Sequence, residues 1–583
     1  MSAQELITEH LDLWTEAVTK KSTSGRGSNG KIELTGIKKL RELILELAVR
    51  GKLVEQNPTD EPAIRLLSKT KALREQLIVE GKLRRQKQAE STKEIEKPYE
   101  IPDSWCWASL PDVASYNPGK TPSTKAPQFW ATGTSGIPWV SIADLNHNSS
   151  VRDTSKAVTQ IAASEVFRSE PTAPGTILMS FKLTVGKVSI NEVPVYHNEA
   201  IISIFPFSGV NRDYLFKVLP MLALGGKTKR AIMGNTLNAT SLAQILVPLP
   251  PQEEQHRIVQ KIDELMALCD QLEQQTSDHL AAHETLVDTL LGTLTQSENA
   301  NELAENWARL ATHFDTLFTT EQSIDKLKQT ILQLAVMGRL VEQDAEDEPV
   351  TALLERISKQ NDQLSNSGRK NAMSCVNERD EPFQLPSKWQ FKRLGDLSHV
   401  FAGNSFKSQD FNDISGTRVI KITNVGVGEL VETQDYLPAK FSEQYSKYQV
   451  MTGDLVLALT RPYISSGLKI AICPDIYNKA LLNQRVAAIR PFLDRSFIYL
   501  YMQSVYVLGL YQARFGGSGL QPNLKMDDVT NLIIPVPPMA EQHRIVHKVD
   551  DLMALCDQLK ERLNQASETR CQLAEAVVSG ATS

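Results

Sequence analysis

The sequence predicts a mixed α/β (α+β) fold, with two globular domains that are separated by long helices and related by an internal two-fold pseudosymmetry. Three observations lead to this prediction: a long internal repeat, a regular spacing of apolar residues inside the repeated segments, and β-rich runs between them. The 583 residues are too many for one hydrophobic core and suggest about four structural units. A hydrophobic content of 41% and a charged content of 23% are typical of a soluble globular protein.

The repeat keeps one shift of 287 residues between segments that lie far apart in the chain. LAVRGKLVEQ at 47–56 returns as LAVMGRLVEQ at 334–343. PLPPQEEQHRIVQKIDELMALCDQL, which starts at Pro248, returns as PVPPMAEQHRIVHKVDDLMALCDQL from Pro535. Chance does not preserve one shift over two matches of this length. The chain is therefore predicted to be a tandem duplication.

The repeated segments that follow the Pro-Pro pairs at 250–251 and 537–538 are predicted to be long helices, because proline suits a first helical turn. Their apolar residues recur at alternating spacings of four and three, which is the seam spacing of a coiled coil. Helices of about 45 residues would be about 65 Å long. Packing of these helices on a globular core remains an alternative. The seam residues include Ile258, Ile262, Leu265, Leu272, Ile545, Val549, Leu552 and Leu559.

The segments between the repeats differ from each other and contain β-rich runs, so each is predicted to be a mixed globular domain. We name them insert 1 (97–250) and insert 2 (385–537). The remaining parts are an N-terminal helical region (1–96), a central helical region (251–384) and a C-terminal helix (538–583). Insert 1 has a net charge of +3 and insert 2 of +4, whereas the rest of the chain carries −13. This distribution is compatible with binding a polyanion. Two recognition domains for different targets would diverge in this way, whereas two equivalent active sites would keep their chemical residues.

Motifs of a catalytic site are absent from the sequence. GGKT at 225–228 resembles the end of a phosphate-binding loop, but Met221 stands where the earlier glycine is required. There is no GxGxxG after a strand, no HExxH and no GxSxG. The six cysteines form no CxxC pair, and the N-terminal residues lack the pattern of a signal peptide. We therefore expect a cytoplasmic protein that is not an enzyme and binds no metal or cofactor itself.

The repeated motifs, the tryptophan at the start of each insert and the loop GKTPS at 119–123 resemble the specificity subunits of type I restriction-modification systems. The resemblance covers nearly the whole chain, whose long N-terminal region is similar to that of the longer members. It implies that the inserts are two target-recognition domains, each recognising one half of an asymmetric, bipartite site in double-stranded DNA. It also implies an antiparallel coiled coil between them, whose helices contact the other subunits. Those would be two modification subunits that bind S-adenosylmethionine and two restriction subunits that use ATP and Mg²⁺.

Loops of the two inserts carry the candidate DNA-binding residues. Glycine-rich loops offer backbone N–H groups, hydroxyls and a cation to phosphates. Asn and Gln can pair with adenine, and Lys and Arg with guanine or phosphate. The alternative for each residue is a turn or a solvated charge. The candidates are Gly119, Lys120, Thr121, Ser123, Lys182, Lys187, Asn235 and Asn238 in insert 1, and Asn404, Ser405, Lys407, Arg461, Lys469, Arg514, Gln521, Asn523 and Lys525 in insert 2.

Two further hypotheses concern function and helix pairing. The chain could instead be a self-contained methyltransferase or nuclease fusion, or a free DNA-binding regulator with two sites. In addition, LITEHLDLW at 6–14 resembles LATHFDTLF at 310–318. The N-terminal helical region is therefore predicted to complete the C-terminal helical repeat. The helix expected at 37–56 should then pack with the helix that ends near Val578.

Overall fold

The chain forms two compact units in a computed structural model. Unit 1 comprises residues 1–278 and 566–583, and unit 2 comprises residues 279–565. The GGKT segment at 225–228 lies outside the described part of the chain. Among the described helices, none combines the length and the hydrophobicity that a transmembrane span requires. The structure describes residues 9–20, 32–84, 97–131, 136–146, 148–224, 229–231, 234–297, 300–364, 375–515 and 522–582.

Insert 1 is built on a five-stranded sheet with the strand order β4-β12-β8-β10-β6. Side chains alternate along β8, so that Ile177 and Met179 pack with helix α7 (Arg212–Leu224) while Leu178 faces a second small core. A smaller sheet pairs β15 with β3 and joins the two ends of the insert. The strands are β3 (Cys106–Ser109), β4 (Ala114–Pro118), β6 (Ser149–Val151), β8 (Ile177–Ser180), β10 (Val188–Asn191), β12 (Ile201–Pro206) and β15 (Leu246–Leu249).

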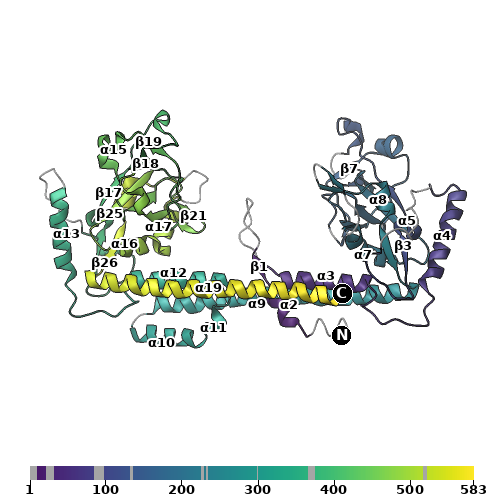
Figure 1. Cartoon of the computed structure of the whole chain (residues 1–583), viewed down its shortest axis with the longest axis horizontal. Coiled ribbons are helices and arrows are strands. Elements are labelled where there is room, and N and C mark those ends of the chain that lie inside the picture. The colour runs from purple at the N-terminus through teal and green to yellow at the C-terminus, as the bar shows by residue number, and fades with distance from the viewer. Residues whose placement is uncertain are drawn as a thin grey trace. The chain divides into compact units, whose positions relative to one another are not determined.

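Insert 2, which contains the labelled strands β17 and β25 in Figure 1, repeats this design. Its main sheet has four strands in the order β17-β25-β20-β23. Leu455 and Leu457 of β20 share a core with helix α16 (Arg495–Met502), whereas Val456 and Ala458 face another core. Helix α17 (Val505–Phe515) follows α16. The same alternation in both inserts agrees with a tandem duplication. The strands are β16 (Gln390–Arg393), β17 (Ser398–Ala402), β20 (Leu455–Ala458), β23 (Ile470–Ile472), β25 (Val486–Pro491) and β26 (Ile533–Val536), where β16 pairs with β26.

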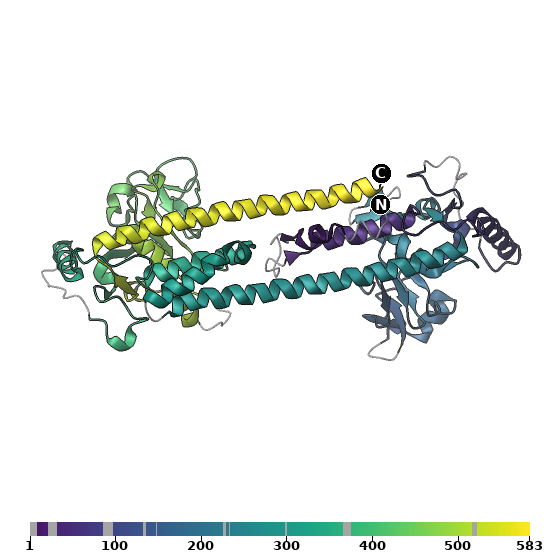
Figure 2. The ribbon, with the colours of Figure 1, turned by 90° about the horizontal axis from the view of Figure 1, so that it is seen from below.

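Two long helices follow the inserts, as the sequence predicts: α9 (Gln252–Gln296, 45 residues) and α19 (Met539–Thr582, 44 residues). In unit 1, helix α3 (Thr35–Val49) lies between the first part of α9 and the last turns of α19 (Figure 2). Arg41 Nη2 lies 2.6 Å from Asp270 of α9, and Lys39 Nζ lies 3.7 Å from Glu575 of α19. The predicted packing of this N-terminal helix with the C-terminal one is confirmed.

Unit 2 has the equivalent arrangement, with α12 (Glu321–Val336) between the first part of α19 and the end of α9. Lys328 pairs with Asp557 of α19, and Lys326 Nζ lies 2.7 Å from Asp288 of α9. Both pairs are the 287-residue counterparts of those in unit 1. Gln343 and Arg339, which follow α12, bond to Glu541 and to the Thr295 carbonyl oxygen. The segment from α12 onward thus runs toward earlier residues of α19 but toward later residues of α9. The two long helices are therefore antiparallel within the unit, as expected for the antiparallel coiled coil.

The helix expected at 37–56 ends earlier than predicted. Helix α3 stops at Val49, and the chain turns at Gly51, where φ is +69°. A Cβ atom on Gly51 would lie 2.5 Å from Pro102 and 3.2 Å from the Trp105 ring. The repeated motif thus contains a left-handed glycine that ends the helix and allows the close approach of insert 1.

Candidate nucleic-acid interface

A buried carboxylate joins each insert to the helix that follows it. In unit 1, Glu254 accepts hydrogen bonds from Trp105 Nε1 at 2.9 Å and from Gln56 Nε2 at 2.5 Å. Arg257, three residues further along the helix, pairs with Asp60 at 2.7 Å. Because Glu254 is fully buried, desolvation raises the pKa of this carboxyl. We call this set of contacts the junction of unit 1.

Unit 2 has the same junction. Glu541 accepts hydrogen bonds from Trp389 Nε1 at 3.1 Å and from Gln343, and burial raises its pKa. Arg544 donates two hydrogen bonds to the Asp347 carboxylate, from Nη1 to Oδ1 at 3.0 Å and from Nη2 to Oδ2 at 2.6 Å. Sequence reasoning missed both glutamates as positioning residues. Their occurrence in both copies of the EQHR motif, beside the repeated Gln, was the signal that could have identified them.

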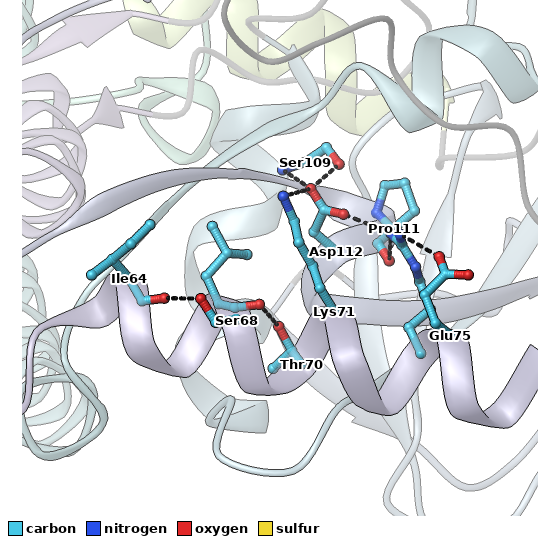
Figure 3. Close-up of polar contacts among 10 residues, drawn as sticks. Ile64, Ser68, Thr70, Lys71, Glu75, Ser109, Pro111 and Asp112 are labelled. Carbon is cyan, nitrogen blue, oxygen red and sulfur yellow. Dashed lines mark hydrogen bonds and ion pairs between the residues drawn. The ribbon is translucent and has the colours of Figure 1, made fainter.

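Helix α4 (Ala63–Val79) is joined to insert 1 by a buried ion pair to Asp112, whose surroundings Figure 3 shows. Arg74 Nη1 lies 2.6 Å from Asp112 Oδ1 and 3.3 Å from the Pro111 carbonyl oxygen. The other oxygen of Asp112 accepts a hydrogen bond from Ser109 Oγ at 2.8 Å. The residue that corresponds to Arg74 in unit 2 is Asn361, so this ion pair is not repeated.

The glycine-rich loop of insert 1 lies where β12 begins. The Gly119 N–H donates to Ile201, and a Cβ at Gly119 would lie 2.0 Å from the His197 carbonyl oxygen, which only glycine avoids. Lys120 directs its ammonium group toward the protein, with Nζ 2.8 Å from the Val166 carbonyl oxygen and 3.1 Å from that of Phe167. Its charge is thus partly engaged by backbone dipoles. The candidates Thr121 and Ser123 are exposed.

A short antiparallel strand pair beyond β8 contains two of the other candidates of insert 1, Lys182 and Asn235. Strand β9 (Lys182–Leu183) pairs with β14 (Gly234–Thr236), which places the backbone of Asn235 opposite Leu183. Lys187 Nζ donates to the Leu145 carbonyl oxygen at 3.1 Å. Asn238 caps helix α8 (Ala239–Ala243) by accepting hydrogen bonds from two backbone N–H groups, so its side-chain oxygen is already used. Lys182 Nζ lies 5.2 Å from the centre of the Phe181 ring.

The first loop of insert 2 has the same backbone path. The Gly403 N–H donates a hydrogen bond to the Val486 carbonyl oxygen. A Cβ atom added to Gly403 would lie 2.3 Å from the Asn483 carbonyl oxygen. Asn404 continues the pairing with the Leu482 carbonyl oxygen. Ser405 and Lys407 are exposed, and the Lys407 ammonium group has no hydrogen bond or ion pair to any residue that the structure describes. Lys407 is therefore better placed than Lys120 to contact a phosphate.

The later loops of insert 2 also meet beside the sheet. The backbone N–H of Arg461 donates a hydrogen bond to the Pro522 carbonyl oxygen at 2.8 Å, and Thr460 forms an antiparallel β-bridge with Asn523. Lys469 Nζ donates a hydrogen bond to the Ile422 carbonyl oxygen at 3.2 Å. Burial lowers the pKa of Lys469, and the positive charge of Arg461 lowers it further by a smaller amount.

The remaining candidates of insert 2 lie near the start of helix α18 (Met526–Thr530), where Arg514 pairs with Asp528 and the Lys525 N–H donates to the same carboxylate at 2.8 Å. Gln521 lies outside the described residues.

The seam residues of the long helices are covered by the chain's own helices. Five of them, Ile258, Ile262, Leu265, Ile545 and Val549, are at most 2% exposed, and Leu272, Leu552 and Leu559 are partly buried in the same two cores. A side chain that is already covered has no surface left for another subunit. This applies to the five buried residues, whereas Leu272, Leu552 and Leu559 keep part of their surface.

The described ranges contain no group of three His, Cys, Asp or Glu side chains that could hold a metal ion. Two copies of one sheet domain, each fixed by a buried junction to antiparallel helices and each presenting polar loops, define a duplicated nucleic-acid recognition subunit. The chain belongs to the type I restriction modification DNA specificity domain family, whose model matches residues 102–282 and 386–568. It is the DNA-recognition component of such a system and not its catalytic one.

Curated relatives span the whole chain. The type I restriction enzyme EcoAI specificity subunit of Escherichia coli is 38% identical, and the EcoEI specificity subunit of the same species is 36% identical; both alignments cover 100% of each chain. Among solved structures, the HsdS subunit from Thermoanaerobacter tengcongensis aligns with a TM-score of 0.39 and 16% identity, over 84% of this chain and 98% of that one.

Proposed function

We propose that this chain recognises an asymmetric, bipartite site in double-stranded DNA, with one half-site bound by insert 1 and the other by insert 2. One observation carries the proposal: the junction and helix contacts of unit 1 recur at equivalent positions of unit 2, while the polar loops differ. Gly119 and Gly403 share a backbone path, but Lys120 and Asn404 follow them. A fixed framework that presents different side chains is the expected design for recognising two different sequences.

The chain also acts as the scaffold of an assembly, in this proposal. It holds two modification subunits, which bind S-adenosylmethionine, and two restriction subunits, which use ATP and Mg²⁺, while binding none of these cofactors itself. The support is the membership of the family and the names of its relatives, which are specificity subunits of type I restriction enzymes. We place this assembly in the cytoplasm, where its DNA substrate would be.

The test is a methyl-transfer assay with S-adenosylmethionine and a mixture of DNA fragments. The chain is assayed alone and after assembly with the modification subunits of its system. We expect transfer only in the assembly, at one bipartite sequence. Transfer by the chain alone would indicate a self-contained methyltransferase. Tight, site-specific binding by the chain alone, unchanged by the modification subunits and without transfer, would indicate a free regulator.

A further inference from the structure

Leu183 and Arg461 share an unusual backbone angle, a positive φ. Their φ angles are +68° and +48°, in the left-handed region that residues other than glycine rarely adopt. Both are exposed, and 47% of the Leu183 surface is open to solvent. An exposed residue with this conformation gains nothing from core packing. The conformation must therefore be imposed by the surrounding backbone.

These two residues occupy the same position in the two inserts. Each comes three residues after the end of a central sheet strand, and each is flanked by the same hydrogen bonds. The Leu237 N–H donates to Phe181 at 2.8 Å in insert 1, and the Leu524 N–H donates to Leu459 at 2.7 Å in insert 2. Leu183 lies opposite Asn235, while the Arg461 N–H donates to Pro522, and positions 235 and 522 are 287 residues apart.

The two inserts reach this conformation by different local means. Thr184 N–H donates to the Lys182 carbonyl oxygen at 2.8 Å, which closes a γ-turn around Leu183. In insert 2 the next residue is Pro462, which has no N–H group and cannot make that bond. The position has thus kept a positive φ through a change of residue and a change of turn.

A second left-handed position provides a contrast. Asn148 and Gly428 are also equivalent, because their N–H groups donate to Val188 and Ile470, the first residues of β10 and β23, both at 3.0 Å. There φ is +56° and +86°, and one copy uses glycine, which this conformation favours. At the position of Leu183 and Arg461 neither copy uses glycine. A side chain is retained in both despite its cost, which indicates that the side chain itself is needed.

We propose that Leu183 and Arg461 are equivalent base-contacting positions, one in each insert, which set the preference for one base pair of each half-site. This inference rests on the proposed function. The apolar side chain of Leu183 suits the methyl group of thymine, and the guanidinium of Arg461 suits O6 and N7 of guanine. Arg461 is exposed, and its guanidinium makes no hydrogen bond or ion pair to the described residues. By contrast, the ammonium groups of Lys187 and Lys469 donate hydrogen bonds to the carbonyl oxygens of Leu145 and Ile422 and are used within the protein.

The test uses the assembled methyltransferase and DNA libraries in which one half-site at a time is randomised; methylated products are sequenced. The variants are Leu183→Gly and Arg461→Gly, because glycine keeps the left-handed backbone and removes only the side chain. Each should lower discrimination at one base pair of its own half-site, by about fivefold to a hundredfold, and leave the other half-site unchanged. The matched controls Thr184→Ala and Ser465→Ala alter exposed neighbours and should change neither.

A reciprocal variant tests the chemistry of the contact. Leu183→Arg should shift one position of its half-site toward guanine. Wild-type discrimination in both glycine variants, or an unchanged base preference in Leu183→Arg, would overturn the inference. So would a melting temperature for the glycine variants well below that of the wild type, because the side chains would then be structural. These results leave the proposed function intact, which fails only if the wild-type assembly methylates no bipartite site.

Discussion

Single residues at the two junctions explain how insert and helix are held together. Glu254 and Glu541 each meet an indole N–H and an amide N–H inside the protein. The sequence predicted the helices on which they lie but not this contact. The donors come from segments 149 to 198 residues away, and spacing along a helix carries no information about such partners.

Replacing Glu254 by glutamine should destabilise unit 1. The amide keeps one acceptor oxygen but turns the other into a donor that faces a donor, at a cost of about 1–3 kcal/mol. Urea denaturation of Glu254→Gln and of Glu541→Gln would measure this, with the exposed neighbour change Glu253→Gln as the control. Wild-type stability in both junction variants would show that these hydrogen bonds do not hold the insert.

Asp347 should make stability depend on pH. Hydrogen bonds from Arg544 lower the pKa of Asp347, so its stabilising contribution is complete above the unfolded pKa, about 3.9, and is lost as the pH falls through the lower folded value. Asp347→Asn should cost about 1 kcal/mol near pH 7 and progressively less below about pH 4. Unfolding free energies of both proteins across this range, with Glu346→Gln as a surface control, test the prediction. A difference independent of pH would contradict it.

Lys407 and Lys120 should differ in their contribution to DNA binding. Lys407→Ala removes an outward charge and should reduce the slope of log K against log salt by about one, for every DNA sequence. Lys120→Ala should change the slope less, because its ammonium group already bonds to two carbonyl oxygens. Salt titrations of the assembled methyltransferase would measure both. Equal changes of slope would mean that Lys120 leaves these carbonyls when DNA binds.

At the scale of elements, the sequence predicted the long helices well and the end of α3 poorly. Apolar spacing and the Pro-Pro pairs located α9 and α19, because a helix of this length imposes its period on the sequence. The end of α3 depends on the left-handed Gly51, whereas the repeat alone predicts a helix that continues to residue 56. Loop contacts were predicted least well, because they depend on the folded positions of distant backbone carbonyls such as that of Val166.

Gly51→Ala should be strongly destabilising, because the residue has a positive φ and the added Cβ would collide with Pro102. Gly81 provides a matched control: its φ is +70°, but a Cβ there meets nothing within 4 Å. We expect a loss of about 1 kcal/mol for Gly81→Ala from strain alone, and a larger loss for Gly51→Ala. Thermal unfolding would compare them. Equal losses would show that the junction adapts to the extra methyl group.

At the scale of the whole molecule, the duplication explains both what is repeated and what differs. Ion pairs such as Arg41–Asp270 and Lys328–Asp557 keep the 287-residue shift, so each unit has the same helical framework. The two inserts share sheet order and the paths of their recognition loops but few loop side chains. The central claim that follows is that each insert determines its half-site independently of the other.

Exchange of an insert tests this claim most directly. Residues 97–250 are replaced by the corresponding insert of the EcoAI specificity subunit, the chimera is assembled with its modification subunits, and the methylated sequence is determined by sequencing the modified DNA. We predict that one half-site changes and the other stays as in the wild type. Replacement of 385–537 should change the other half-site instead. A chimera in which both half-sites change, or neither does, would contradict the account.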